Sequence, residues 1–461
     1  MNIRESSYGY WSSNASFLWV AGGAVIGIGN IARLPYLMGE HGGIIFLFVY
    51  LLALVLVGLP LLLTEWLIGR WMRDDVVSGF ARITSAAKAN PAWASLGWIS
   101  FAGAVLILSY YSVIAGWSAA YAFRAAMGLI HAIDAERARH VFAALAQDAE
   151  RGLSWHTLFM VMATIVVSHG IRDGMERASR VWVPIAFLMA ITICVYAAIN
   201  GNSSAALIYL LTPDFGRCGW RGVLEALHLA FFTLGLGMGV MLTLGTYLPA
   251  NAPLVRLAVG VVLMDTVFSL VAGFAVFALI FDAGLDPQPG IAILFKVFPQ
   301  ALPNSGWGML MAVLFFAMLF IITLSAGTTL LETATRFVME RQRTTRAFAS
   351  TTGSILIWFV GLWSLLSFSV LSPMRFYGWT FFEWAQWLST SLLAPLAGLM
   401  ICVFAGRFLP PELARGVWGE RYAAGFRIWS WLLRYPARIG LIAVLLYSMG
   451  VLDWLAQLWS P

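Results

Sequence analysis

Three polar or charged residues lie inside long apolar segments of the sequence. Asn30 and Arg33 fall within the stretch GGAVIGIGNIARLPY, residues 22–36, and Asp265 lies near the middle of the apolar run 255–281. Because such side chains are costly in the hydrocarbon of a membrane, they are retained there mainly for function. These residues are therefore the first candidates for a functional site at membrane depth.

Glycines interrupt the same kind of segment at two places. Gly27 and Gly29 immediately precede Asn30, and the stretch FFTLGLGMGVMLTLG, residues 231–245, breaks the sixth apolar run in a similar way. An unwound helix exposes backbone groups that need partners: the N-terminus of a half-helix attracts a carboxylate, and free carbonyls coordinate a cation. The pattern predicts an inverted-repeat transporter whose substrate and ion meet at the midplane between two broken helices.

Composition identifies the chain as an integral membrane protein. Of its 461 residues, 61% are hydrophobic and only 11% are charged. The uncharged run 44–63 is long enough to cross about 30 Å of hydrocarbon as a helix. The net charge of +6 is spread over loops instead of being gathered with aromatic residues on one domain, which argues against nucleic-acid binding. The three cysteines do not predict a disulfide framework.

Apolar runs bounded by charged residues, proline and glycine predict eleven transmembrane spans in one all-α domain, residues 1–461. The expected organisation is a first five-helix repeat at about 14–199, a second at about 222–405 and one extra helix at about 437–458. The predicted spans are 14–38, 44–69, 93–127, 153–169, 178–199, 222–248, 255–281, 306–338, 349–371, 379–405 and 437–458.

The distribution of basic residues predicts the orientation in the membrane. Loops that share a side with the N-terminus hold most of the arginine and lysine, including Arg341, Arg343 and Arg346. Such residues accumulate on the cytoplasmic side, so we expect a cytoplasmic N-terminus and, with eleven spans, an external C-terminus. The expected location is the inner (plasma) membrane, and the expected surroundings are membrane lipid. The sequence leaves open whether the protein is a monomer or a homodimer.

Structural explanations of the stretch 22–36 account for only part of it. Gly23 and Gly27 have the spacing of a helix-packing face, and Pro35 could simply kink the helix. The glycines also match a dinucleotide-binding fingerprint, but no strand precedes them. None of these explanations accounts for Asn30 and Arg33.

With these residues in view, the stretch resembles the first helix of the neurotransmitter:sodium symporter family, which typically reads G-x-A-V-G-L-G-N-x-x-R-F-P-Y. Further matches follow in the family's order across nearly the whole chain. They are GEHGG and LPLLLTEWLIGRW near the second span, SYYSVIAGW at 109–117, GMERASRVWVP at 174–184, LTPDF at 211–215, AFFTLGLGMG at 230–239, MDTVFSLVAGFAVF at 264–277 and TLSAGTTLLE at 323–332.

The resemblance implies the leucine-transporter fold, two inverted five-helix repeats that bind an organic substrate and sodium between helices 1, 3, 6, 7 and 8. It implies a secondary active transporter, not an enzyme, that uses one or two Na⁺ ions and no organic cofactor. The first sodium site maps onto Val25, Asn30, Thr233 and Asp265. The second maps onto Gly23, Ile26, Ile322 and Ser325.

Two departures from the family bear on ion coupling. Relatives commonly place asparagine at the position of Asp265 and need chloride as an added anion, and Leu229 replaces a glutamine that helps to hold that anion. We expect Asp265 to supply the fixed negative charge, so that transport does not need chloride. In the second sodium site the family's two adjacent hydroxyls become Ser325 and Ala326, which predicts a weaker or empty site.

The substrate pocket implied by the resemblance is mainly apolar. Tyr111 and the amides of Ile28 and Gly29 would hold a substrate carboxylate, and glycine at position 27, where amine carriers have aspartate, implies an amino acid. A large aliphatic or aromatic side chain fits the remaining wall. The full set is Ala24, Val25, Ile28, Gly29, Ile107, Tyr111, Phe232, Thr233, Gly235, Met238, Ala326 and Leu330.

The implied gates depart from the family at both ends. On the outside, Arg33 matches the gate arginine, and the candidates for its acid partner in the tenth span are Glu383 and, one turn later, Gln386. On the inside the matching residues are Trp11, Tyr247 and Glu340. The family's arginine before that tryptophan is replaced by Tyr8, and Arg4 is the alternative.

The inner end of the fifth span carries one further family feature. Gly174 and Pro184 have the spacing that lets this end unwind and open a water path toward the second sodium. An ordinary helix start with an early proline is an equally good interpretation of the same spacing.

The function expected from these features is sodium-coupled import of a neutral hydrophobic or aromatic L-amino acid by alternating access, independent of chloride. Two alternatives stay open: a proton-coupled or uncoupled carrier of the same fold, and a sensor that binds an amino acid without cycling. A membrane enzyme is disfavoured because the histidines lack metal-ligand spacing and no Ser/His/Asp set converges.

Overall fold

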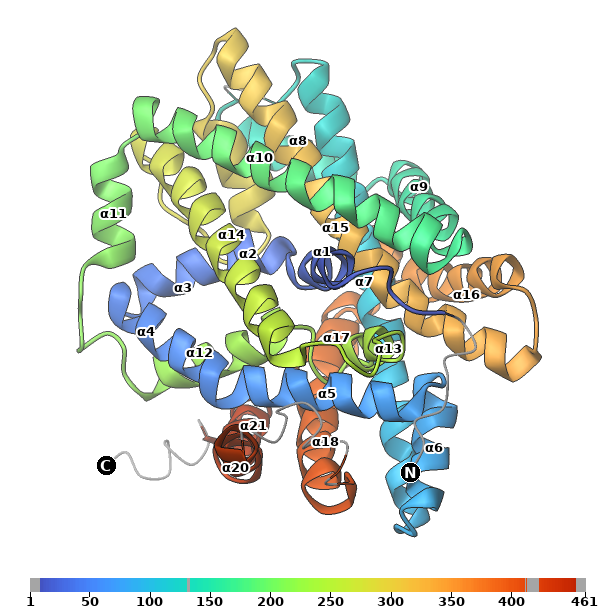
Figure 1. Ribbon diagram of the computed structural model, residues 1–461. Coiled ribbons are helices and arrows are strands. Elements are labelled where there is room, and N and C mark those ends of the chain that lie inside the picture. The colour runs from blue at the N-terminus through green and yellow to red at the C-terminus, as the bar shows by residue number, and fades with distance from the viewer. Residues whose placement is uncertain (1–8, 131–132, 411, 413–422, 453–461) are drawn as a thin grey trace.

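The computed structural model describes residues 9–130, 133–410, 412 and 423–452, and most of them are helical (Figure 1). The only bridge among these residues joins Phe376 and Trp379 in a loop. The helices that cover the first repeat are α1 (Asn14–Val25), α2 (Ile28–Ala32), α3 (Leu34–Glu40), α4 (Ile44–Ala53), α5 (Leu59–Met72), α6 (Val76–Ala86), α7 (Ser95–Ala126), α8 (Ala135–Ala146), α9 (Ala149–Ser168) and α10 (Arg177–Asn200).

The second half of the chain continues in the same way. Short π-helical or 3-10 segments prolong several helices, among them η1 (Leu54–Gly58), η3 (Ile171–Glu176) and η6 (Leu388–Leu393). The helices here are α11 (Ser203–Leu211), α12 (Trp220–Thr233), α13 (Val240–Gly245), α14 (Leu254–Asp282), α15 (Gly306–Gln342), α16 (Arg346–Leu366), α17 (Phe381–Trp387), α18 (Ala394–Phe408), α20 (Ala423–Arg434) and α21 (Pro436–Ser448).

Every predicted span contains helix, but the count of eleven crossings is not confirmed. Eight helices of the described chain are long and apolar enough to cross a membrane, and a ninth crossing results if the bent pair 14–25 and 28–40 is one span. The predicted spans 153–169 and 222–248, which correspond to α9 and to the α12–α13 pair, are not among them. The architecture is that of an all-helical polytopic membrane protein.

The first span is broken where its glycines predicted a break. Helix α1 ends at Val25, α2 begins at Ile28, and the two parts meet at 60°. Gly27 sits in extended conformation at the break, and its amide is satisfied by the Asn30 side chain (Gly27 N to Oδ1, 2.7 Å). Asn30 therefore caps the helix that the break creates, which is one physical reason for an asparagine at this depth.

The sixth span is interrupted between α12 and α13 by left-handed backbone. Gly235, Gly237 and Gly239 have φ angles of 62°, 73° and 76°, a region that side chains with a Cβ rarely adopt. Glu65, buried in α5, accepts a hydrogen bond from the amide of Gly237 at 2.7 Å. Unwound backbone at membrane depth needs such a partner, and a neighbouring helix supplies it here.

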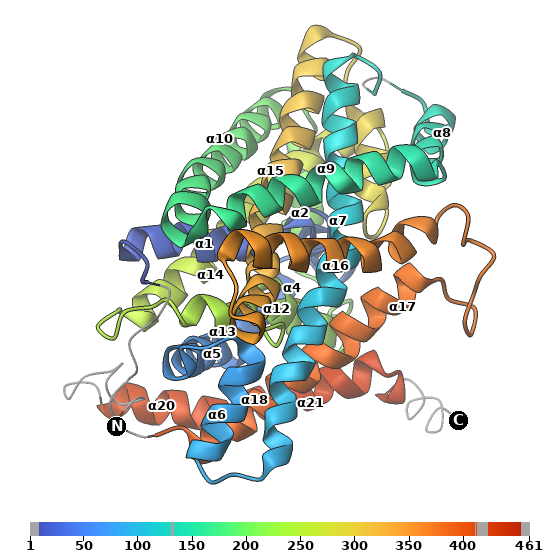
Figure 2. The same cartoon turned by 90° about the vertical axis from the view of Figure 1, so that its right-hand side faces the viewer.

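Two long helices form the axis of the molecule. Helix α7 runs from top to bottom in Figure 2, where α9 and α16 cross it, and α15 packs against α7, α9, α10 and α16. The broken first span packs through α1 and α2 against α14 and α15. The helix breaks are thus enclosed by the longest helices of the fold.

The extra helix begins earlier than the sequence predicted. Helix α20 starts at Ala423, not near residue 437, and continues after a turn at Tyr435 and Pro436 into α21. Together they form one candidate span, Ala424–Ser448, and the predicted end at 453–458 lies outside the described residues. The apolar periodicity placed the start too late because α20 is amphipathic and carries arginines at Arg427 and Arg434.

Candidate functional site

Asp265 is the centre of a buried polar cluster between three spans. Its Oδ1 accepts hydrogen bonds from Asn30 Nδ2 at 2.7 Å and from Thr233 Oγ1 at 2.8 Å, and its Oδ2 accepts one from Tyr50 at 3.1 Å. Asp265 is fully buried, and Ser269 one turn later bonds the same Asn30 nitrogen at 2.8 Å. The carboxylate therefore joins both broken spans and the second span, and its partners are neutral dipoles.

The remaining member of the predicted first sodium site lies at a helix end. Val25 is the last residue of α1, as Thr233 is the last residue of α12, so each site residue stands at the edge of a break. The carbonyls at the C-terminal end of a helix have no intrahelical partners and suit a cation. The structure thus brings Asn30, Thr233 and Asp265 into contact and places Val25 at the adjoining helix end.

All four residues of the predicted second sodium site line one small cavity. Gly23, Ile26, Ile322 and Ser325 surround a space of about 10 Å³, which α10 closes with Trp182, Val183 and Ala186. That volume is close to the minimum that holds a water-sized particle.

One side-chain oxygen that lines this cavity has no hydrogen-bond partner in the described chain and is available to a bound ion. The Ser325 hydroxyl is buried and has no hydrogen-bond partner within the described part of the chain. Gly23 allows α1 to pack closely against α15 and α10. A Cβ at this position would collide with the Ser325 hydroxyl and would lie 2.8 Å from Val183. Backbone carbonyls, one hydroxyl and the available space fit a small hard cation.

Tyr111 presents a second buried hydroxyl without a partner in the described residues, and this one lies beside the first break. A Cβ added to Gly27 would come within 3.4 Å of the Tyr111 oxygen, whereas nothing lies within 4 Å of a Cβ on Gly29. The phenol therefore faces the start of α2, where backbone amides are available to an anion. A hydroxyl and helix-terminal amides converging on one space suit a carboxylate group.

The predicted pocket residues are buried or half-buried. Met238, Ile107, Ile28, Ala326 and Leu330 are all less than one-tenth exposed, while Ala24, Gly29, Tyr111, Phe232, Thr233 and Gly235 are half-buried. They come from the two broken spans and from α7 and α15, which pack together. The polar groups of this set are few, so the wall is apolar.

The predicted partner of Arg33 in the outer gate is wrong. Arg33 forms an ion pair of 2.9 Å with Glu225 of α12 and lies 3.1 Å from His228 Nδ1. Glu383 instead caps its own helix, because Thr380 N and Oγ1 donate to its Oε2. Gln386 is exposed on α17. The structure pairs Arg33 with neither of the two predicted partners in the tenth span.

Glu225 was missed because the arginine's partner was sought only in the tenth span. An acid inside an apolar run is itself a signal, and Glu225 stands in the sixth run, eight residues before Thr233. Tyr447 of α21 also bonds this carboxylate (OH to Oε1, 2.8 Å). The sequence offers no comparable signal for Tyr447, because the bond depends on packing between helices far apart in the chain.

The predicted inner-gate residues Trp11 and Tyr247 are in contact. Trp11 N donates to the Tyr247 carbonyl at 3.2 Å, and the two rings pack edge to face with centroids 5.6 Å apart. Glu340 lies one contact away, since it accepts from Arg336 at 2.6 Å and Arg336 lies 3.4 Å from the Tyr247 hydroxyl. Tyr8, which replaces the family's arginine, and the predicted alternative Arg4 lie outside the described residues.

Two further charged groups extend this cluster. The Tyr247 hydroxyl donates to Glu332, and Arg346 forms an ion pair with the other oxygen of the same carboxylate. Glu332 is fully buried in α15. An acid within the predicted span 306–338 was the available sequence signal.

The start of the fifth span, η3 with the first turn of α10, binds the segment that precedes α1. Glu176, at the end of the π-helical segment η3, accepts from Ser12 N and Ser12 Oγ, both at 2.6 Å. Arg180 donates to the same hydroxyl at 2.6 Å and pairs with Glu176 at 3.2 Å. Gly174 lies within η3 and Pro184 inside α10, so this helix end begins with a π-helical turn, and whether it unwinds stays a prediction.

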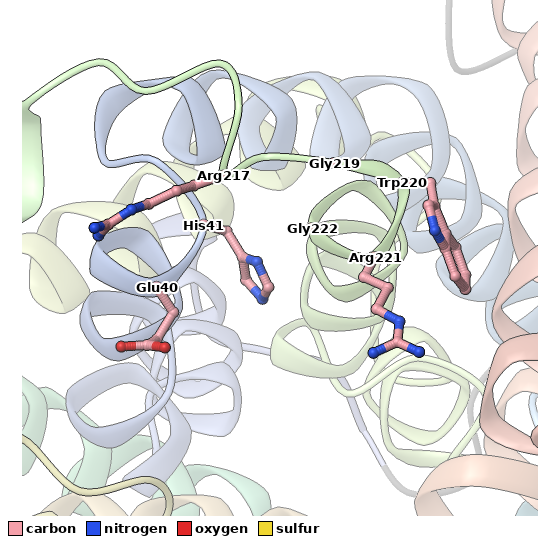
Figure 3. Close-up of a pocket in the computed structure, with 7 residues that line it drawn as sticks. All are labelled: Glu40, His41, Arg217, Gly219, Trp220, Arg221 and Gly222. Atoms are coloured by element: carbon pink, nitrogen blue, oxygen red, sulfur yellow. The ribbon is translucent and has the colours of Figure 1, made fainter. Parts of the chain in front are cut away.

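A separate cavity opens at the surface between α3 and the start of α12 (Figure 3). It has a volume of about 570 Å³ and is lined by charged and aromatic residues. In Figure 3 the Glu40 carboxylate and the His41 ring lie on one side and Arg221 and Trp220 on the other. This cavity contains none of the predicted ion or substrate residues.

Sequence comparison decides the family. The profile of the Sodium:neurotransmitter symporter family matches residues 8–131 and 146–406, which is most of the chain. The chain belongs to this family. It is therefore a membrane transporter, which is not an enzyme class, and the resemblance predicted from the motifs is confirmed.

Relatives agree with this membership over most of their length. The sodium-dependent transporter YhdH of Bacillus subtilis is 31% identical over 449 residues, covering 96% of this chain and 98% of that protein. A sodium-dependent transporter of Haemophilus influenzae is 25% identical over 446 residues, covering 95% and 98%. The creatine transporter of Torpedo marmorata is 21% identical over 435 residues, covering 83% and 69%.

A solved structure of the symporter family has the same fold. The crystal structure of MhsT in complex with L-phenylalanine superposes with a TM-score of 0.85 at 32% identity, covering 96% of this chain and all of that chain. The leucine-transporter fold expected for this family member is confirmed by that match. The protein is thus a sodium-dependent, multi-pass membrane transporter of a small molecule.

Proposed function

We propose that this transporter couples sodium to the import of a neutral L-amino acid with a large aliphatic or aromatic side chain. The substrate class is inferred from the Tyr111 hydroxyl. This hydroxyl is buried beside Gly27 and the N-terminus of α2 and has no hydrogen-bond partner in the described chain. A carboxylate would accept from this hydroxyl and from the amides near Ile28 and Gly29. Glycine at position 27 provides no acidic side chain that could pair with the amino group of a substrate lacking a carboxylate.

The pocket wall supports the second half of this proposal. Ile107, Phe232, Met238 and Leu330 offer apolar surface, and Gly235 contributes no side chain of its own. A thioether adapts to the shape of its neighbour, which suits bulky side chains. The related structure holds L-phenylalanine, a ligand of this class.

We propose that Asp265 is the fixed anion of the first sodium site and replaces chloride. Its contacts with Asn30, Thr233 and Tyr50 are hydrogen bonds from neutral groups, so its negative charge is not compensated by a nearby cation. Sodium bound among Val25, Asn30, Thr233 and Asp265 would supply that compensation. A second anion at this place would be repelled, so transport should not require chloride.

The cavity around Ser325 would hold the second sodium. Its oxygen ligands would be the carbonyls of Gly23, Ile26 and Ile322 with the Ser325 hydroxyl, while Ala326 contributes none. With one hydroxyl fewer, this ion binds more weakly than the first. Its release into water would follow unwinding of η3, which borders the span that closes the cavity.

Transport then proceeds by alternating access in the plasma membrane, with the N-terminus cytoplasmic and the C-terminus outside. The contact of Trp11 with Tyr247 closes the inner side, and Arg33 with Glu225 belongs to the outer side. Membrane lipid surrounds a monomer or a homodimer. Movement of the inverted repeats, at about 14–199 and 222–405, against each other would interconvert the outward-open and inward-open states.

Uptake into liposomes tests this proposal against its alternatives. We expect L-phenylalanine or a similar amino acid to accumulate with an inward sodium gradient and equally well in chloride or gluconate. Accumulation in choline driven by a pH gradient would favour a proton-coupled carrier, for which the buried acid Asp265 is the specific observation. Binding without flux in any gradient would indicate a sensor.

A further inference from the structure

The end of α21 lies between the sixth and tenth spans and contacts both through adjacent residues. The Tyr447 hydroxyl donates to Glu225 Oε1 of α12 at 2.8 Å. The next residue, Ser448, accepts from the Trp387 indole of α17 through its carbonyl oxygen at 3.2 Å. The extra helix, which belongs to neither repeat, packs most extensively on α18 of the tenth span and also contacts α12 and η1.

The Glu225 carboxylate uses one oxygen for each of two partners. Its Oε2 pairs with Arg33 at 2.9 Å, and its Oε1 receives the Tyr447 hydroxyl. Arg33 and Glu225 belong to the outer halves of the two broken spans. In transporters of this architecture, alternating access moves one bundle of helices against the other around a central site. Both broken spans are bonded to Asp265, so we place them in the same bundle.

An ion pair inside the moving bundle does not by itself hold the outside closed. Arg33 and Glu225 move together, so their pair can persist when the outer side opens. The bond between Glu225 and Tyr447 instead joins the moving sixth span to a helix fixed on the tenth span. It is this bond that must break when the outer halves swing away.

We propose that Tyr447 is a positioning residue of the outer gate, a latch through which the extra helix holds the Arg33–Glu225 pair in the closed state. The proposal rests on the transport function proposed above and adds the contact that closes its outer side. A phenol bonded to a carboxylate is a charge-assisted hydrogen bond. Its loss should shift the balance toward the outward-open state by about tenfold, the usual effect of removing a hydrogen bond to a charged group.

A single cysteine in α12 reports this shift without requiring transport. Leu229 is 3% exposed and lies one helical turn from Glu225 on the same face, so Leu229→Cys is reached from outside only when the outer halves separate. The variant is placed in a background in which Cys194, Cys218 and Cys402 are alanine. Labelling by a membrane-impermeant maleimide is timed in proteoliposomes of the full chain, in potassium and in sodium.

Matched variants separate a latch from simple packing. Tyr447→Phe should raise the labelling rate about tenfold while the melting temperature stays unchanged, because the ring is kept and only the hydroxyl is lost. Tyr435→Phe, the same change at an exposed position where the extra helix turns, should leave the rate unchanged. In a Glu225→Ala background, Tyr447→Phe should have no further effect.

Two results would overturn the proposal. An unchanged labelling rate in Tyr447→Phe would do so, and so would an equal further increase in the Glu225→Ala background, which would indicate packing. The proposed function fails separately, if the parent protein neither takes up amino acids nor changes its labelling rate with sodium. Failure of the latch alone would leave sodium-dependent uptake intact.

Discussion

Arg33 is paired with Glu225, an acid of α12 in the other broken span, at 2.9 Å. The two broken spans are therefore joined by this ion pair, in addition to meeting around Asp265 at the first helix break. These contacts hold α12 against the segment that follows the first break. Glu383, one of the two candidates in the tenth span for the partner of Arg33, serves its own helix as a cap.

The ion pair should be needed for transport. Replacing Glu225 by glutamine leaves Arg33 half-buried without a counter-charge, and truncating one partner of such a pair typically costs about 2–5 kcal/mol when it is fully buried and less when water reaches it. We expect initial uptake to fall roughly tenfold in Glu225→Gln. Glu383→Gln is the control and should stay close to the parent rate. Equal losses of uptake in the two variants would indicate that an acid of the tenth span also belongs to the outer gate, which contradicts this prediction.

Asp265 should carry both sodium affinity and chloride independence. In Asp265→Asn the fixed charge is lost while the shape is kept, so the sodium concentration for half-maximal substrate binding should rise on the order of 100-fold. Residual activity in this variant should become dependent on chloride, which can supply the missing charge. Asp282→Asn, at the exposed end of the same helix, is the control. A parent protein that strictly needs chloride would contradict this account.

The second cation cavity should respond to the addition of one hydroxyl. Ala326→Ser would offer a further hydroxyl oxygen beside the Ser325 hydroxyl, and a hard ion with more oxygen ligands binds more tightly. We expect a severalfold lower sodium requirement in Ala326→Ser and a higher one in Ser325→Ala, measured by titrating binding with sodium at constant ionic strength. If neither variant changes the sodium dependence, this cavity does not hold a coupling ion.

Tyr111 should affect substrate affinity and not sodium affinity. Tyr111→Phe removes the hydroxyl that faces the substrate space, so we expect the dissociation constant of the amino acid to rise about tenfold. Its neighbour Tyr110 is also buried but packs edge to face on Phe382, so Tyr110→Phe serves as the control. The measurement is equilibrium binding in saturating sodium. A similar affinity in Tyr111→Phe and the parent would argue against a carboxylate at this hydroxyl.

Local chemistry made much of the fold predictable. The glycines around residues 27 and 235 predicted both helix breaks, and at Gly235, Gly237 and Gly239 the positive φ angles explain why glycine occupies the position. The polar groups Asn30 and Asp265 were recognised because they stand alone in apolar runs, and the structure brings them together at 2.7 Å. These are signals that a residue carries by itself.

Contacts between distant segments were harder to predict. Asp265 and Tyr50 are far apart in sequence, and so are Glu225 and Tyr447; no spacing rule relates the members of either pair. The start of the extra helix was predicted too late because the arginines of α20 interrupt the apolar run from which spans were predicted. Side-chain partners at a gate depend on helix packing, which one sequence without its structure does not specify.

Binding of the twenty amino acids to the purified protein in sodium, potassium and choline tests the central claim most directly. The account predicts that one or more large aliphatic or aromatic L-amino acids bind in sodium chloride and in sodium gluconate, with affinity lost in potassium and in choline. If none of the twenty binds in any of these salts, or if binding is the same in all of them, sodium-coupled amino-acid transport by this chain is contradicted.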